Sequence, residues 1–262
     1  MSANPIDLSS LSLELFNAER EARSIAPLTE RFPTLSITDA YGIQQQLISR
    51  RVESGETVIG KKIGVTSQAV MELLKVNQPD FGMLTDRMVV NQGEAIDMGR
   101  LIQPKAEGEI AFVLKRDLCG PGVTAADVLR ATEGVMACFE IVDSRIRDWQ
   151  IKIQDTVADN ASCGLFVLGD RLVDPAELDL YSVGMVLEKN GRVVGTGAGA
   201  ATMGSPLTAV AWLANTLGSL GMGLKAGDVI LSGALSGMVP VSRGDNLNIT
   251  LAGIGRTGVR FE

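Results

Sequence analysis

Residues 107–114 read Glu-Gly-Glu-Ile-Ala-Phe-Val-Leu, so two carboxylates stand directly before an apolar run. Successive side chains of a strand point to opposite faces, which puts Glu107, Glu109 and Ala111 on one face. Apolar residues on both faces favour burial, although a generic Glu-x-Glu pair is usually a solvated strand end. Two carboxylates on one buried face repel each other, and one takes up a proton unless a cation lies between them. The segment therefore predicts a strand that ends either in solvent or at a buried cation site.

A third carboxylate stands in another β-type run, Cys-Phe-Glu-Ile-Val at residues 138–142. Glu140 in such a run either faces water or serves as a ligand. Three carboxylates around a doubly charged cation would leave coordination positions open for substrate oxygens and water, as Mg²⁺ prefers. The spacing of Glu107, Glu109 and Glu140 therefore points to a hard-cation site as the alternative to solvated positions.

The chain contains no histidine, and this absence excludes several kinds of site. A Ser-His-Asp triad, a Cys-His pair and any metal site that needs histidine are ruled out. Acid–base chemistry must fall to Asp, Glu, Lys, Tyr, Cys or a metal-bound water. A catalytic metal would be held by oxygen atoms, which favours Mg²⁺ or Mn²⁺ over zinc or copper.

The pattern around these strands predicts an α+β fold. Apolar residues recur at helical spacing from Leu8, and a second helix starts at the N-cap Ser36 and closes at Gly55. From Val58 onward, short β-type runs alternate with glycine turns, and Asn190-Gly191 indicates a hairpin. The β-type runs are 58–65, 88–90, 108–114, 138–142, 164–168, 184–188, 193–195, 228–232, 247–251 and 258–261. Further helices are expected at 67–74, 124–132 and 205–217. The alternation is not a regular βαβ repeat, so we expect a helical part at 1–57 and a mixed, strongly curved β domain at 58–262.

Composition narrows the class of protein. With 24 basic and 31 acidic residues, the formal net charge is −7, which disfavours binding to a nucleic-acid backbone. Residues 1–20 lack the pattern of a signal peptide, and the apolar stretch 207–224 is interrupted as in a buried helix, not a membrane span. Cys119, Cys138 and Cys163 form no disulfide or zinc pattern, so we expect a reducing cytoplasmic location.

The segment Gly-Lys-Lys-Ile-Gly at residues 60–64 carries two adjacent lysines. In a strand they point to opposite faces, so we expect one of them to point outward and the other inward. The alternative is a solvated basic edge. The segment lacks the pattern of a phosphate-binding loop.

Three polar or glycine-rich segments complete the set. Gln-Pro-Asp-Phe-Gly at 78–82 reads as a turn containing Asp80, and the polar run 155–162 reads as a loop. The glycines of 195–204 do not fit a dinucleotide fingerprint, because the strand-to-helix placement and the partner acid are missing.

Taken in order, these segments resemble the fumarylacetoacetate hydrolase superfamily, and in particular its 2-keto-4-pentenoate hydratase branch. The resemblance covers nearly the whole chain beyond residue 30. The matching segments are GKKIGVTS (60–67), QPDFG (78–82), AEGEIAF (106–112), FEIVDSRIRDW (139–149), DTVADNASCG (155–164), GAGAATMGSP (197–206) and GDVILSGAL (227–235).

The resemblance implies a β-roll catalytic domain with a small helical N-terminal part. It implies one Mg²⁺ or Mn²⁺ held by the three glutamates. Lys62 matches the family's active-site lysine, and Asp80, Asp159 and Ser162 match positions that line its pocket. We expect Lys62 and Asp80 to be catalytic, with Asp80 as the candidate base for the attacking water. Lys61 would point to the other face of the strand, so Lys61→Ala should be nearly silent. In the sister decarboxylases the place of Asp80 tends to be apolar. The resemblance also implies a homo-oligomer, and a possible complex with 4-oxalocrotonate decarboxylase.

The resulting hypothesis is a hydro-lyase that converts 2-hydroxypenta-2,4-dienoate (2-oxopent-4-enoate) to 4-hydroxy-2-oxopentanoate in meta-cleavage degradation of aromatic compounds. The first alternative is the 4-oxalocrotonate decarboxylase activity of the same family. Hydrolysis of a carbon–carbon bond is disfavoured by the lack of histidine. A non-catalytic supporting subunit is disfavoured because a scaffold has no reason to bury three like charges.

Overall fold

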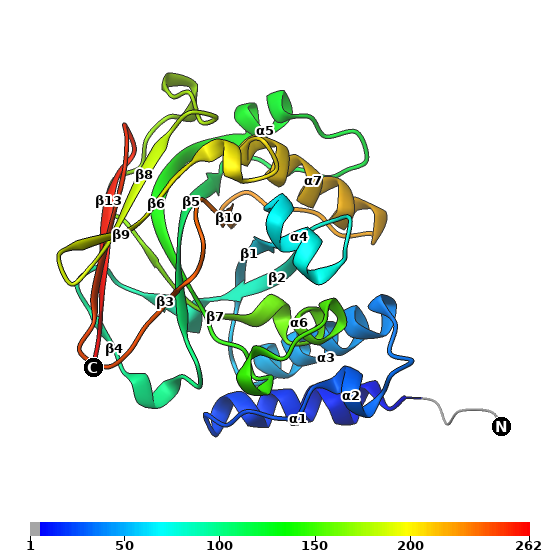
Figure 1. The fold of residues 1–262 in the computed structure, drawn as a ribbon. Helices are drawn as coiled ribbons and strands as arrows, with labels where there is room; N and C mark the ends of the chain where they lie inside the picture. The colour runs from blue at the N-terminus through cyan, green and yellow to red at the C-terminus, as the bar shows by residue number, and fades with distance from the viewer. Residues whose placement is uncertain (1–5) are drawn as a thin grey trace.

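The computed structural model describes residues 6–262, which form two β-sheets and a layer of helices (Figure 1). The α-helices are α1 (Leu8–Arg20), α2 (Leu28–Arg31), α3 (Ile37–Glu53), α4 (Gln68–Leu74), α5 (Ala125–Ala131), α6 (Ile153–Ala158) and α7 (Pro206–Ser219). The strands are β1 (Val58–Gly64), β2 (Asp80–Thr85), β3 (Val89–Val90), β4 (Ala95–Ile96), β5 (Lys105–Leu114), β6 (Thr132–Val142), β7 (Cys163–Leu168), β8 (Gly184–Lys189), β9 (Arg192–Ala198), β10 (Val229–Ala234), β11 (Val239–Pro240), β12 (Asn246–Leu251) and β13 (Gly255–Phe261).

The first sheet has the order β2-β1-β10-β5-β6-β7-β3, with β11 also paired to β5, and it curls into a half-barrel (Figure 1). Its pairs are mixed: β1 runs parallel to β10, whereas β5 and β6 are antiparallel. The inner face is closed at one end by an apolar cluster that includes Ala111, Cys138, Phe166 and Leu231. The prediction of an α+β fold with a mixed, strongly curved sheet is confirmed.

The second sheet, β4-β13-β12-β8-β9, packs against the outside of the half-barrel. Ile110 and Phe112 of β5 share one buried core with Leu187 and Ile249 of the second sheet. Gly108 makes this contact possible, because a Cβ built there would lie 2.4 Å from the sulfur of Met185. The glycine between the two predicted ligands therefore lets the second sheet lie directly behind them.

The helical layer consists of α1, α2 and α3, which pack around α6 (Figure 1). The predicted start of α3 is confirmed, since Ser36 and Asp39 form a reciprocal capping box. The predicted boundary at residue 57 falls between α3 and β1. Because Val157 and Ala158 of α6 belong to the same apolar cluster as α1 and α3, the division into two domains stays a prediction.

Two local expectations have different outcomes. The hairpin at Asn190-Gly191 is confirmed, with positive φ at both residues, as its turn type requires. The turn expected at 78–82 is wrong beyond Pro79, because β2 begins at Asp80 and pairs with β1. Pro79 and Asp80 favour a turn locally, but pairing with β1 draws Asp80 into a strand. Within residues 6–262, no helix combines the length and apolarity needed to cross a membrane.

Candidate active site

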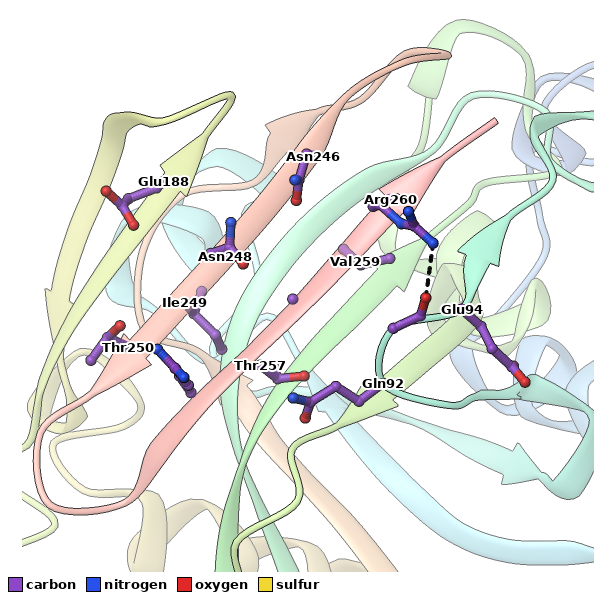
Figure 2. A pocket seen from close by; sticks show the side chains of 13 residues that line it. Gln92, Glu94, Glu188, Asn246, Asn248, Ile249, Thr250, Thr257, Val259 and Arg260 are labelled. Carbon is purple, nitrogen blue, oxygen red and sulfur yellow. Dashed lines mark hydrogen bonds between the residues drawn. The ribbon is translucent and has the colours of Figure 1, made fainter.

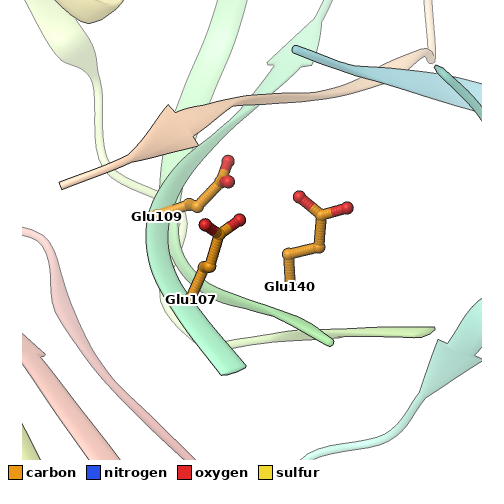
Figure 3. Close-up of side chains that lie close together, drawn as sticks. All are labelled: Glu107, Glu109 and Glu140. Carbon is orange, nitrogen blue, oxygen red and sulfur yellow. The ribbon is translucent and has the colours of Figure 1, made fainter. Parts of the chain in front are cut away.

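Glu107, Glu109 and Glu140 converge on the inner face of the half-barrel (Figure 3). The first two lie on β5, and Glu140 lies on β6 directly opposite Glu107. One carboxylate oxygen from each lies within 4.8 Å of the others. Glu109 and Glu140 are fully buried and Glu107 is half-buried, so the solvated alternative is wrong for the two buried residues.

The cluster carries unsatisfied negative charge. One oxygen of Glu109 accepts a hydrogen bond from the Gly233 N–H at 2.7 Å. Its other oxygen and both oxygens of Glu140 accept no hydrogen bond from residues 6–262, although the Lys62 ammonium forms an ion pair with Glu140. Burial, followed by the charge of Glu140, raises the pKa of Glu107 to about 7 and the pKa of Glu109 well above its ordinary range. Buried carboxylates with free lone pairs are the donor set that a hard divalent cation fits.

Lys62 borders this cluster from β1. Its Nζ lies 3.1 Å from a carboxylate oxygen of Glu140 and donates to the Ala161 carbonyl oxygen at 3.1 Å. Burial by itself would lower the pKa of Lys62, but the charges of Glu140 and Asp80 outweigh it and hold this pKa above its ordinary value. Lys62 is therefore a buried ammonium, and of the two adjacent lysines it is the one that points toward the carboxylates.

Asp80 is the first residue of β2 and is almost fully buried. Neither of its oxygens has a hydrogen-bond partner within the described chain. Burial raises the pKa of Asp80 to about 6, against the lowering effect of Lys62. A Cβ built on Gly64 would lie 2.2 Å from an Asp80 oxygen and 3.4 Å from the Lys62 Nζ. Gly64 thus leaves the space in which the carboxylate and the ammonium face one another.

A pocket of about 530 Å³ opens beside Asp80. Its wall includes Ile37 and Tyr41 of α3 and Ile153 and Val157 of α6, so the helical layer contributes directly to it. The ring of Tyr41 stacks on Phe81, with ring centroids 4.7 Å apart. An apolar wall next to a few polar groups is typical of a site for a small molecule.

A second hollow of similar volume lies on the outer face of the five-stranded sheet (Figure 2). Asn246, Asn248 and Arg260 contribute to its lining. None of the predicted site residues contributes to this second hollow. Asp80 is the one predicted site residue in the lining of the first pocket, and the glutamates and Lys62 line neither, so the pocket is the candidate substrate site through Asp80 alone.

Asp159 and Ser162 flank a turn next to Lys62. Asp159 forms a buried ion pair with Arg145 and also accepts from the Arg145 backbone N–H at 3.0 Å. Burial raises the pKa of Asp159 to about 6, while Arg145 acts against that rise. The Ser162 Oγ lies 3.2 Å from the Thr156 Oγ1. The structure brings both residues close to the site, and their contact with substrate stays a prediction.

Three residues near the site, Arg145, Asn160 and Tyr41, were not singled out from the sequence. In the sequence, Arg145 is one of several charged residues after an apolar strand and Asn160 is one of several polar residues in 155–162, so no local pattern marks either of them. Arg145 is fully buried and donates to the Asp143 and Cys163 carbonyl oxygens. A large, fully buried guanidinium is rare unless its donors are paired, as they are here.

The expected exposure of Lys61 is wrong. Lys61 does point away from the carboxylates, but it is buried, and its Nζ lies 2.7 Å from an Asp228 carboxylate oxygen. Asp228 lies just before β10, the parallel neighbour of β1. The partner is remote in sequence, so the local pattern contained no sign of it.

The two lysines are expected to separate catalysis from stability. Lys62→Ala should lower turnover by about 10²–10³-fold, because it removes a cation from the place where negative charge develops. Lys61→Ala should leave turnover per folded molecule unchanged but cost about 3 kcal/mol of unfolding free energy, since Asp228 is left buried and unpaired. Turnover rates and denaturant unfolding of both variants check this, and equal losses of turnover would contradict it.

The fold and the site define a class of protein. Residues 58–262 match the family model described as "Fumarylacetoacetate (FAA) hydrolase C-terminal", and the chain belongs to this family. It is 61% identical over 216 residues to the 2-hydroxypent-2,4-dienoate hydratase of Pseudomonas putida, covering 82% of this chain and 97% of that protein. It is 56% identical over 249 residues to the 2-hydroxyhexa-2,4-dienoate hydratase of Comamonas testosteroni, covering 94% of each. These similarities place it in the hydratase branch.

The fold of this chain is also similar to that of a solved structure. The 4-oxalocrotonate decarboxylase from Pseudomonas putida G7, complexed with magnesium and adipate, matches with a TM-score of 0.96 at 38% identity. The match covers 99% of this chain and 100% of that one. This chain therefore shares its fold with a decarboxylase, whereas its higher sequence identities are to the two hydratases.

Proposed function

We propose that this enzyme is a hydro-lyase that adds water to 2-hydroxypenta-2,4-dienoate and yields 4-hydroxy-2-oxopentanoate, in the meta-cleavage degradation of aromatic compounds. The observation that carries the proposal is the unpartnered, buried carboxylate of Asp80, which faces Lys62 at the wall of a small-molecule pocket. A carboxylate whose pKa is about 6 is ionised at neutral pH and can accept a proton from water.

Glu107, Glu109 and Glu140 would hold the metal ion, for which we propose Mg²⁺ or Mn²⁺. When bound, the ion supplies Lewis-acid stabilisation for negative charge that develops on the 2-oxygen of the substrate. The second oxygen of Glu109 and both oxygens of Glu140 accept no hydrogen bond from the described residues, which supports this assignment, although Glu140 also forms an ion pair with Lys62. Magnesium is also present in the related decarboxylase structure.

Asp80 and Lys62 are the side chains that we propose for the proton transfers of the hydration. The dienol loses its hydroxyl proton and is protonated at C5, giving a 2-oxo-3-enoate. Asp80 takes a proton from the water that adds to C4, and the resulting enolate is protonated at C3. Lys62 stabilises the enolate oxygen or relays a proton, because its ammonium lies between Asp80 and Glu140. Ser162 and Asp159 would orient the substrate from the turn that contacts Lys62.

Decarboxylation of 4-oxalocrotonate is the alternative, because it also passes through an enolate. The glutamates and Lys62 would serve both reactions equally. Decarboxylation needs no base for an attacking water, so the buried carboxylate of Asp80 favours hydration. The similarity to two proteins named as hydratases favours it as well.

A product assay tests the proposal directly. The purified chain, with Mg²⁺ or Mn²⁺, is offered 2-hydroxypenta-2,4-dienoate, its six-carbon homologue and 4-oxalocrotonate in separate reactions. We expect 4-hydroxy-2-oxopentanoate from the first substrate and no release of CO₂ from the last. Release of CO₂ from 4-oxalocrotonate with the pentadienoate left untouched would contradict the assignment. Comparing the two dienoates measures the preferred tail length.

Assembly and location remain part of the proposal. We propose a homo-oligomer and a possible complex with the sister decarboxylase. The edge strand β9 supports self-association, since Val193 and Val194 are 60% and 46% exposed. The free thiols of Cys119, Cys138 and Cys163 suit a cytoplasmic setting. Light scattering and co-purification with the decarboxylase would test the two kinds of assembly.

A further inference from the structure

The strand that carries Asp80 lies at an edge of the half-barrel. β2 is the first strand of the sheet order and pairs with β1. On its other side, the side-chain amide of Asn160 takes the place of a neighbouring strand. The Met83 N–H donates to the Asn160 Oδ1 at 2.8 Å, and the Asn160 Nδ2 donates to the Met83 carbonyl oxygen at 2.9 Å. This two-point contact joins β2 to the residues just before β7.

Asn160 is held firmly in an unusual conformation. Asn160, Ala161 and Ser162 all have positive φ, at 54°, 53° and 53°. Such values are unfavourable for residues other than glycine and persist where the surroundings impose them. Arg145 contributes to this here, because its guanidinium binds both the carboxylate and the carbonyl oxygen of Asp159, the residue directly before Asn160.

The same turn also contacts Lys62. The Ala161 carbonyl oxygen accepts from the Lys62 Nζ at 3.1 Å, one residue after the amide that binds β2. The backbone of the turn and β2 lie so close that a Cβ on Gly82 would be 2.5 Å from the Asn160 carbonyl oxygen. One rigid turn therefore sets the positions of both Lys62 and the strand that starts at Asp80.

We propose that Asn160 is a positioning residue for the hydration step, which fixes β2 so that the Asp80 carboxylate faces Lys62 and the pocket. The inference rests on the proposed function. Asn160 contacts backbone atoms of β2, and it acts through Asp80. Displacements of a reacting group of about 1 Å can cost on the order of 10²-fold in rate, so a side chain that fixes an edge strand has a large effect available to it.

The chain offers a matched control in Asn215 on α7. Its amide makes the same two-point contact, with Val123 N–H donating to Oδ1 at 2.9 Å and Nδ2 donating to the Val123 carbonyl oxygen at 2.9 Å. Asn215 contributes neither to the carboxylate cluster nor to the pocket beside Asp80. Removing it deletes the same pair of hydrogen bonds elsewhere in the fold.

The experiment compares Asn160→Gly with Asn215→Ala. Glycine tolerates the positive φ, so the first variant loses the amide without added strain. We expect Asn160→Gly to lower kcat by about 10- to 100-fold, with KM and Mn²⁺ affinity within about twofold of wild type. Asn215→Ala should keep the wild-type kcat. Hydrogen exchange should show faster exchange of the Met83 amide in Asn160→Gly alone.

Wild-type kcat in Asn160→Gly, or an equal loss in Asn215→Ala, overturns the inference. Asn160→Asp provides a second variant, since it keeps the acceptor for Met83 N–H but loses the donor, and its kcat should also fall. Unchanged protection of the Met83 amide in Asn160→Gly overturns the inference without reference to activity. Failure of the proposed function would instead appear as a wild-type enzyme that does not hydrate the dienoate.

Discussion

Hydration is expected to cease when divalent cations are removed with a chelator, and to return when Mg²⁺ or Mn²⁺ is added. The reason is the cluster of Glu107, Glu109 and Glu140, in which burial and then mutual repulsion raise the pKa of the first two. A cation relieves that repulsion and supplies the charge that stabilises the enolate. Assays in metal-free buffer, followed by titration with each ion, measure the effect.

Single substitutions sharpen this test. Glu140→Gln should weaken Mn²⁺ binding by roughly one to two orders of magnitude or more, by analogy with other changes around metal ligands. Glu107→Gln should act in the same direction. Glu133→Gln is the matched control, because Glu133 lies on the same strand β6 but is exposed. Full activity in metal-free buffer, or equal Mn²⁺ affinity in all three variants, would refute the metal assignment.

Asp80→Asn is expected to lower the hydration rate by about 10²–10⁴-fold, the usual contribution of a general base. Asparagine has nearly the same shape but cannot accept the proton of the attacking water. Burial raises the pKa of Asp80 to about 6, so the required carboxylate form is present above that pH and is lost as the pH falls through it. Asp80 has no hydrogen-bond partner among residues 6–262 and asparagine keeps its size, so the melting temperature should change little, although Lys62 loses one of the carboxylates that raise its pKa.

The control for this variant lies at the other end of the same strand. Asp86 follows β2 directly and is exposed, so Asp86→Asn should hydrate at the wild-type rate. Rates, melting temperatures and Mn²⁺ affinities of both variants separate a catalytic role from a structural one. If Asp80→Asn hydrates as fast as wild type, Asp80 only shapes the start of β2.

Local alternation was enough to predict the strand at 107–114 and the shared face of Glu107 and Glu109. It could not show that Glu140 lies opposite Glu107, because that depends on the register between β5 and β6. Its place in an apolar β-type run made Glu140 a candidate third ligand, the resemblance to a known family favoured that reading, and the register gives the physical reason. The predicted fold class was readable because the β-type runs and glycine turns recur along most of the chain.

The errors and omissions arise where a partner is distant in the sequence. Lys61 was expected in solvent, yet its partner Asp228 lies 167 positions away. Asp80 was assigned to a turn because Pro79 precedes it, although β1 recruits it into a strand. The contact between Asn160 and Met83 spans 77 positions and depends on a backbone conformation that composition does not encode.

The pocket beside Asp80 is built from two parts of the chain, one that carries the predicted reacting groups and one that covers the pocket. Every residue predicted to be catalytic or metal-binding lies in residues 58–262, whereas Ile37 and Tyr41 come from α3. Gln44 of the same helix also donates to the carbonyl oxygens of Phe81 and Val157, at 2.8 and 3.0 Å. If α3 separated transiently from β2, bulk water would enter the pocket beside Asp80. Glu107, Glu109 and Glu140 would keep their places, because they lie on the paired strands β5 and β6.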